Sequence, residues 1–106
     1  MAYQYRISPR AEKSFRDCLE YLLYKVGGTG NIQAGQNFLN DFQRTVAQIK
    51  DNANSYPICE GEKLQSLCIR KIHFKHMKYK IFFHLDKQTV VIDLICHDLQ
   101  DYENLF

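Results

Sequence analysis

Positive charge is concentrated in one stretch of this chain, residues 63–87. That stretch holds seven Lys or Arg residues and one acid, so its net charge is +6 in a chain whose total is +2, and the remainder carries −4. The basic residues are Lys63, Arg70, Lys71, Lys75, Lys78, Lys80 and Lys87, and the acid is Asp86. An asymmetry of this kind indicates a polyanionic partner. The alternative is a solvated edge hairpin whose lysines prevent aggregation.

Aromatic rings alternate with the lysines of this stretch. The lysines expected to bind a nucleic-acid backbone are Lys63, Lys71, Lys78 and Lys80. The interleaved rings are Phe74, Tyr79 and Phe82. Recognition of single-stranded RNA uses this combination, because cations hold the backbone and rings stack on the bases. The alternative is that the rings belong to the core, and for Tyr79 and Phe83 a core position is the preferred interpretation.

Three histidines, His73, His76 and His84, lie inside the basic stretch, and His97 follows it. An imidazole titrates near pH 6.5 when unperturbed, which suits proton transfer. His84 shares its expected strand face with Lys80, an arrangement that would allow proton transfer beside a cation. His73 and His76 are separated by two residues but lack a third ligand at a convincing spacing, so neither a metal nor a cofactor is expected.

The composition is that of a small globule. The 106 residues fit a single domain, 1–106, and 45% of them are hydrophobic. No apolar leader and no stretch of about 18 apolar residues is present, so we expect a cytoplasmic protein that does not associate with membranes. The four cysteines form no C-x-x-C pair, which favours reduced thiols.

The first half of the chain is expected to form one strand followed by two helices. Residues 3–7 predict a short strand, and Ser8-Pro9 is typical of a helix start. Apolar residues recur at helical spacing over 10–26 and again over 32–51, with Asn31 as the expected N-cap. The short connection predicts an antiparallel helix hairpin, and Gly35 could let the two helices approach closely.

In the second half of the chain the apolar residues recur at every second position, as they do in β-strands. A loop is expected at 52–57 and again at 60–62, followed by strands over 67–74, 79–85 and 89–96. One face of the last strand should carry Val90, Ile92, Leu94 and Cys96. The fold class is therefore α+β, a two-layer β-α-α-β-β-β domain with the helix hairpin packed on one face of a mainly antiparallel sheet. The other face should be free and collect Lys78, Lys80 and His84.

Several motifs, in this order, resemble the RelE/ParE toxins of bacterial type II toxin–antitoxin systems. They are Ile7-Ser8-Pro9-Arg10-Ala11, Tyr56-Pro57, Ile69-Arg70-Lys71-Ile72, Tyr79-Lys80-Ile81-Phe82-Phe83 and Ile95-Cys96-His97-Asp98-Leu99-Gln100-Asp101. The resemblance implies a growth-inhibiting toxin that a cognate antitoxin holds inactive in a toxin–antitoxin hetero-oligomer. It also implies one of two targets. RelE-like members cleave mRNA on the ribosome without a metal, and ParE-like members poison DNA gyrase without known enzymatic activity.

For the RelE-like branch, the resemblance implies a set of catalytic residues. Arg70 matches the family's strand arginine and would clamp a phosphate, or it would hold a nearby acid. His97 falls where several nuclease members carry a catalytic histidine, or it would hydrogen-bond to the turn that follows. Tyr102 lies near where nuclease members place a stacking or catalytic aromatic. His84, which is a candidate because of its expected strand face and not through the resemblance, completes the set. The acidic tail, with Asp98, Asp101 and Glu103, departs from that pattern, so gyrase poisoning and an inactive binding module remain alternatives.

Overall fold

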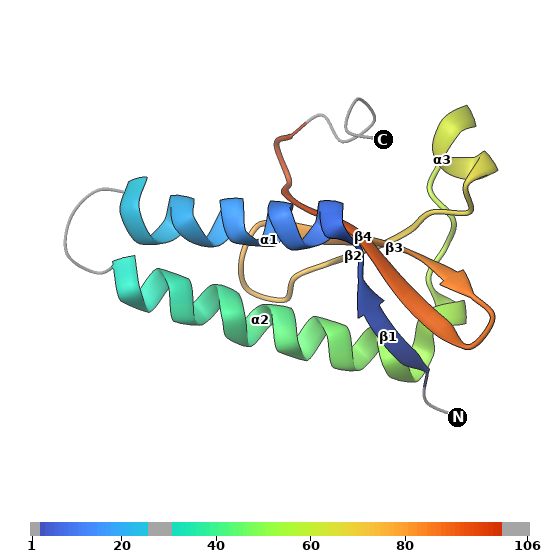
Figure 1. Ribbon diagram of the computed structural model, residues 1–106, viewed down its shortest axis with the longest axis horizontal. Helices are drawn as coiled ribbons and strands as arrows, with labels where there is room; N and C mark the ends of the chain where they lie inside the picture. Colours follow the sequence, from blue (N-terminus) through green and yellow to red (C-terminus); the bar gives the residue numbers. More distant parts are fainter. Residues whose placement is uncertain (1–2, 26–30, 101–106) are drawn as a thin grey trace.

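The computed structural model describes residues 3–25 and 31–100. In chain order the elements are β1 (Gln4–Ile7), α1 (Pro9–Glu20), the π-helical turn η1 (Tyr21–Lys25), α2 (Asn31–Asn52), the 3-10 turn η2 (Ala53–Ser55), α3 (Glu62–Ser66), β2 (Arg70–His73), β3 (Tyr79–Asp86) and β4 (Thr89–His97). The helices α1 and α2 run antiparallel, side by side (Figure 1). No helix in the described ranges is long and apolar enough to cross a membrane.

The four strands form one mixed sheet in the order β1-β4-β3-β2. The last three strands are antiparallel neighbours, and β1 joins the sheet in parallel beside β4. The pairing of β1 with β4 therefore brings the first and the last elements of the chain side by side. The predicted α+β class and the mainly antiparallel sheet are confirmed.

The start of α1 is held to β4 by Ser8. The Ser8 hydroxyl accepts a hydrogen bond from the Ala11 N–H at 3.1 Å, as an N-cap does, and Pro9 occupies the first helical turn. The Ser8 N–H donates to the Ile92 carbonyl at 3.0 Å. The same residue therefore caps the helix and fixes its starting point on the sheet.

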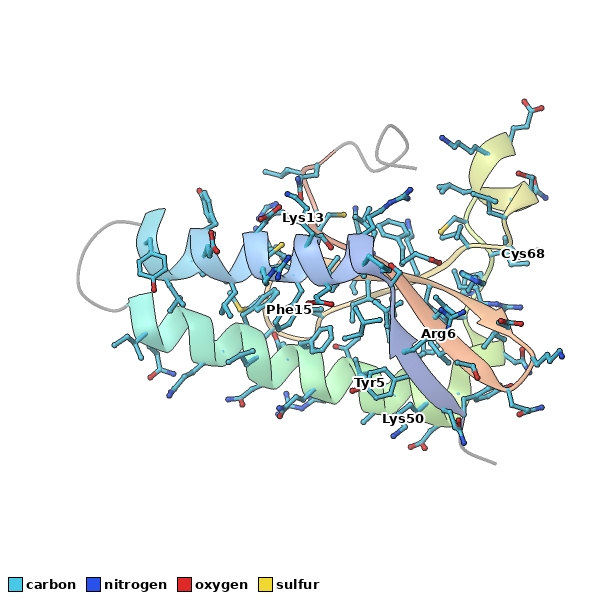
Figure 2. All side chains as sticks on the ribbon, in the orientation of Figure 1. Tyr5, Arg6, Lys13, Phe15, Lys50 and Cys68 are labelled. Atoms are coloured by element: carbon cyan, nitrogen blue, oxygen red, sulfur yellow. The ribbon has the colours of Figure 1, made fainter. Side chains whose placement is uncertain are left out.

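The main core lies between the helix pair and one face of the sheet. Its fully buried members include Phe38 and Ile49 of α2, Ile81 and Phe83 of β3, and Ile92 of β4. The predicted apolar stripes of both helices supply their side of this core. A ring from α1 also packs between the two helices, since the Phe15 ring centroid lies 4.7 Å from that of Phe42 (Figure 2).

The second helix begins at Asn31 itself, one residue earlier than expected. Gly35 of α2 packs closely against η1 and the end of α1, because a Cβ added there would lie 2.7 Å from the Leu23 Cδ2 atom and 3.5 Å from the Leu19 Cδ1 atom. The expected close approach at this glycine is therefore confirmed.

The prediction for the faces of β4 was wrong beyond Ile92. A bulge shifts the register between Phe82 and Phe83 of β3, whose partners on β4 are Leu94 and Ile92, so Asp93 is an extra residue. An extra residue reverses the alternation of side chains. As a result Leu94 leaves the main core and lies on the opposite face of the sheet.

The expectation of a free second face was also wrong in part, because α3 covers some of it. The segment expected to be a loop and then strand contains this helix, and Cys68 after it adopts a left-handed backbone, with φ 57°. That conformation suits a helix end and not a strand, so β2 begins only at Arg70. A second small core forms beneath α3 from Cys59, Leu64, Ile69, Phe82, Leu94 and Cys96.

Candidate functional site

Arg70 lies on the helix-facing side of the sheet. It pairs with Phe83, a main-core residue, so the two side chains share a face. Its guanidinium donates hydrogen bonds to the carbonyl oxygens of Asn54, at 3.4 Å, and Tyr56. In the structure this arginine therefore ties β2 to the segment that follows α2.

His97, at the end of β4, also faces the helices. It pairs with Tyr79, and the two ring centroids are 5.1 Å apart. Its Nδ1 accepts a hydrogen bond from the Leu99 N–H at 3.1 Å. A nitrogen that accepts carries no proton, so this contact assigns the proton of the neutral ring to Nε2. The imidazole thus bonds to the turn beyond the strand.

His84 lies on the opposite face, beside the bulge. Its Nδ1 is 2.7 Å from Asp93 Oδ2. Burial raises the pKa of the Asp93 carboxyl, whereas His84, Arg10 and Arg6 lower it. The pair borders a small hollow of about 330 Å³ that Arg10 and Ile69 also line. Strand alternation places His84 and Lys80 on one face, as expected, but three strand residues lie between them.

The candidate catalytic residues therefore do not meet within the part of the chain that the structure describes. Arg70 and His97 face the helices, and His84 faces away from them. Tyr102 lies outside the described residues. Each of the three described side chains makes contacts that stabilise the fold.

The four candidate nucleic-acid-binding lysines occupy different environments. Lys63 on α3 and Lys78 in the turn before β3 are exposed, and Lys71 on β2 is half-buried. Lys80 is only 5% exposed, and its ammonium lies 5.9 Å from the centroid of the Phe82 ring. An ammonium so deeply placed is poorly available to an incoming phosphate, which corrects the expectation of an exposed Lys80.

The three rings considered for base stacking are all buried. Phe74 is 6% exposed, Tyr79 5% and Phe82 0%. Phe74 and Tyr79 pack in the main core, and Phe82 packs beneath α3. The core interpretation is thus confirmed for Tyr79 and Phe83, and stacking on bases is ruled out for Phe74 and Phe82.

A cleft of about 820 Å³ opens where η1, the turn before β3 and the end of β4 come together. Apolar side chains such as Leu22, Met77 and Leu99 line it, together with Lys78 and His97. Tyr21 and Leu99 remain 52% and 89% exposed at its border. An apolar cleft with exposed apolar residues beside it is typical of a surface that another molecule covers.

The turn that forms one wall of this cleft is anchored by Asp41. This α2 carboxylate is 2% exposed, and its Oδ2 accepts hydrogen bonds from the N–H groups of His76 at 3.1 Å and Met77 at 2.8 Å. Arg44 lies 3.8 Å from the other carboxylate oxygen. The Asp41 carboxylate of α2 therefore accepts hydrogen bonds from two backbone N–H groups of the turn.

Sequence reasoning missed one group of polar residues on the sheet face away from α1 and α2. His73 Nδ1 lies 3.3 Å from Asp98 Oδ1, and the Lys80 ammonium donates to the Asp98 carbonyl at 3.3 Å. His73 pairs with Lys80 across β2 and β3. The strand alternation could have placed His73 and Lys80 on one face, but the position of Asp98 depends on the bulge in β4.

Comparisons with known proteins agree on one kind of protein. The family model described as "ParE toxin of type II toxin-antitoxin system, parDE" matches residues 5–102. No curated protein matches the chain. A chain from the chromosomal ParDE system of P. aeruginosa is similar in fold, with a TM-score of 0.66 and 13% identity, over 91% of this chain and 96% of that one.

The isolated E. coli RelE toxin is similar as well. It superposes with a TM-score of 0.54 and 14% identity, over 98% of this chain and 93% of the RelE chain. Identities this low show a shared fold, whereas the family model covers nearly the whole sequence. The chain therefore belongs to the ParE toxin family of type II toxin–antitoxin systems, within the wider RelE/ParE group.

Proposed function

We propose that this toxin inhibits growth by binding DNA gyrase and poisoning it, without bond-breaking chemistry of its own. The observation that carries the proposal is the separation of the candidate catalytic residues. Arg70 and His97 lie on one side of the sheet and His84 on the other, and all three make contacts within the fold. Membership of the ParE toxin family supports the same target.

Residues 1–106 would act as one toxin domain with a cognate antitoxin as its partner. The cleft beside η1 suits a protein surface better than a nucleic acid, because side chains such as Leu22, Met77 and Leu99 make its lining mainly apolar, with Lys78 beside them. An antitoxin bound there would form a toxin–antitoxin hetero-oligomer. Toxin and gyrase would meet in the cytoplasm.

A short induction in bacterial cells tests the proposed target. Translation, measured by incorporation of a labelled amino acid, and plasmid supercoiling are followed in parallel over the first minutes. Gyrase poisoning predicts DNA double-strand breaks and a DNA-damage response while translation continues. An early stop in translation with unchanged supercoiling would contradict it. Growth that continues normally would point to an inactive binding module.

Ribosome-dependent mRNA cleavage is the second candidate function. The observation in its favour is that Lys71, His73 and Lys80 lie on one face of the sheet, within a segment of net charge +6. Cations and an imidazole are the groups that metal-free RNA cleavage requires. This function predicts that mRNA is cut in the presence of ribosomes.

A further inference from the structure

Residues 63–85 carry six lysine or arginine side chains and no acid. The lysines among them that are exposed or half-buried are Lys63, Lys71, Lys75 and Lys78. Three of these follow one edge of the sheet, because Lys71 lies on β2, the outermost strand, and Lys75 and Lys78 lie in the turn after it. These three lysines are called the cationic edge. Such a row of like charges attracts a polyanion.

The turn that carries Lys75 and Lys78 is held in place from within the protein. The buried Asp41 carboxylate accepts hydrogen bonds from two of its backbone N–H groups. The Lys78 carbonyl accepts a third hydrogen bond, from the Asp98 N–H at 2.9 Å. The two lysine side chains therefore extend into solvent from a fixed backbone. A support that is already ordered reduces the entropy lost when a partner binds.

The charges of this turn are not neutralised by nearby carboxylates. Within residues 3–25 and 31–100, neither Lys75 nor Lys78 forms an ion pair. The exposed cations of α1 differ in this respect. Lys13 Nζ lies 2.9 Å from an Asp17 carboxylate oxygen, and Arg16 lies 3.8 Å from one of Glu12. The turn lysines thus keep their charge for a partner outside the chain.

The same stretch offers no exposed Phe or Tyr ring on which a base could stack. Each of its four such rings is at most 6% exposed, namely Phe74, Tyr79, Phe82 and Phe83. Proteins that bind single-stranded nucleic acid combine cations with exposed rings for successive bases. Lysines alone contact phosphates and carry no sequence information. The cationic edge therefore suits the backbone of a duplex, whose bases are already stacked on one another.

We propose that the cationic edge binds the phosphate backbone of the duplex DNA that gyrase holds, so that the toxin recognises the enzyme–DNA complex. This inference rests on the proposed function and adds a second component to the target. Gyrase supplies duplex DNA at the place where the toxin acts. Because Lys78 also lines the apolar cleft, a protein bound in that cleft would cover part of the cationic edge.

The salt dependence of binding tests this contact. Fluorescence anisotropy of the labelled full chain gives its Kd for purified gyrase alone and for gyrase with a bound duplex. Wild type should bind the complex more tightly than gyrase alone. If each of the three lysines contacts one phosphate, this gain should fall about 40-fold between about 50 mM and about 200 mM salt, since each contact contributes about 0.9 to the slope of log K against log salt.

A double variant of the turn keeps the anchored backbone and removes two charges. Lys75→Gln with Lys78→Gln should lower that slope by about 1.8, and at physiological salt about 10-fold more toxin should be needed for the same amount of gyrase-cleaved linear plasmid. Adding Lys71→Gln should increase both effects. The matched control removes two charges from α1, with Lys13→Gln and Arg16→Gln, and should change neither quantity. Circular dichroism of each variant shows that it is folded.

The outcomes separate the inference from the function on which it rests. Linear plasmid that is reduced by the turn variant and kept by the α1 control supports the inference. Equal amounts of linear plasmid with the turn variant, at an unchanged salt slope, overturn it but leave gyrase poisoning standing, with the lysines protecting an edge strand. Tighter binding to a single-stranded RNA than to the gyrase–DNA complex also overturns it. Wild-type toxin that yields no linear plasmid overturns both.

Discussion

The His84 imidazole and the Asp93 carboxylate meet at 2.7 Å because a bulge in β4 gives that strand one residue more than β3. The same bulge residue accepts a weak hydrogen bond from the Ser8 hydroxyl at its carbonyl, at 3.5 Å. The start of α1, the irregular point of β4 and the middle of β3 are therefore joined through Asp93. In the structure His84 is therefore part of the junction that joins these three elements.

Replacing Asp93 with Asn should change how stability depends on pH. Burial raises the pKa of Asp93 above its ordinary value of 3.8, so the folded state favours the neutral carboxyl. The contribution of that neutral form is fully present below pH 3.8 and is lost as pH rises through the raised pKa. Urea unfolding at pH 4 and pH 7 should show that wild type gains more stability than Asp93→Asn on going to the lower pH. An equal or opposite change would contradict the burial argument.

Removing the Ser8 hydroxyl should destabilise the start of α1. Ser8→Ala leaves the Ala11 N–H without its cap, which costs about 1 kcal/mol in typical helices. Ser8→Thr keeps a hydroxyl and serves as the control, with a smaller loss. Thermal unfolding followed by circular dichroism measures both. If the alanine and threonine variants were equally stable, the cap would contribute nothing.

Asp41 should be more important for stability than its position on a helix suggests. Asp41→Ala removes the acceptor of two turn N–H groups, and we expect a loss of about 1–3 kcal/mol in unfolding free energy. The amide protons of His76 and Met77 should exchange faster in the variant. As a control, Gln43→Ala changes an exposed residue of the same helix and should leave both amides protected. Unchanged exchange in Asp41→Ala would show that the turn does not depend on the carboxylate.

Alkaline conditions should destabilise the fold through the thiols of Cys18, which is half-buried, and Cys96, which is buried. Burial raises the pKa of Cys18 from 9.0 to about 12 and that of Cys96 to about 11. The stabilising contribution of each neutral thiol is complete below pH 9 and is lost as pH rises toward the folded value. Between pH 8 and pH 10.5, wild type should lose more unfolding free energy than Cys18→Ala, which has one thiol fewer to ionise. A parallel loss in both proteins would argue against Cys18 as a source.

The regular elements of this fold follow from short-range patterns. Helical spacing predicted α1 and α2, Ser8-Pro9 predicted where α1 begins, and Gly35 predicted the close approach of the helices. Alternation along β3 correctly placed Tyr79, Ile81 and Phe83 in the core. These features depend on residues a few positions apart, which is why the sequence reveals them.

The features that the sequence did not reveal depend on irregular backbone. Nothing in the composition of residues 89–96 marks Asp93 as a bulge, yet one extra residue there exchanges the two faces for the rest of β4. Cys68, in a left-handed conformation, ends α3 inside what looked like a strand. Both irregularities determine the polar sites, because they place His84 beside Asp93 and cover part of the second sheet face with α3.

The proposal that this toxin poisons DNA gyrase is tested most directly with purified components. Relaxed and supercoiled plasmids are incubated with gyrase, ATP and the toxin, and the DNA is resolved on a gel after protein is removed. The proposal predicts linear, gyrase-cleaved plasmid that accumulates with toxin concentration and requires gyrase. Unchanged supercoiling activity and no linear DNA, with toxin that still arrests growth in cells, would contradict it.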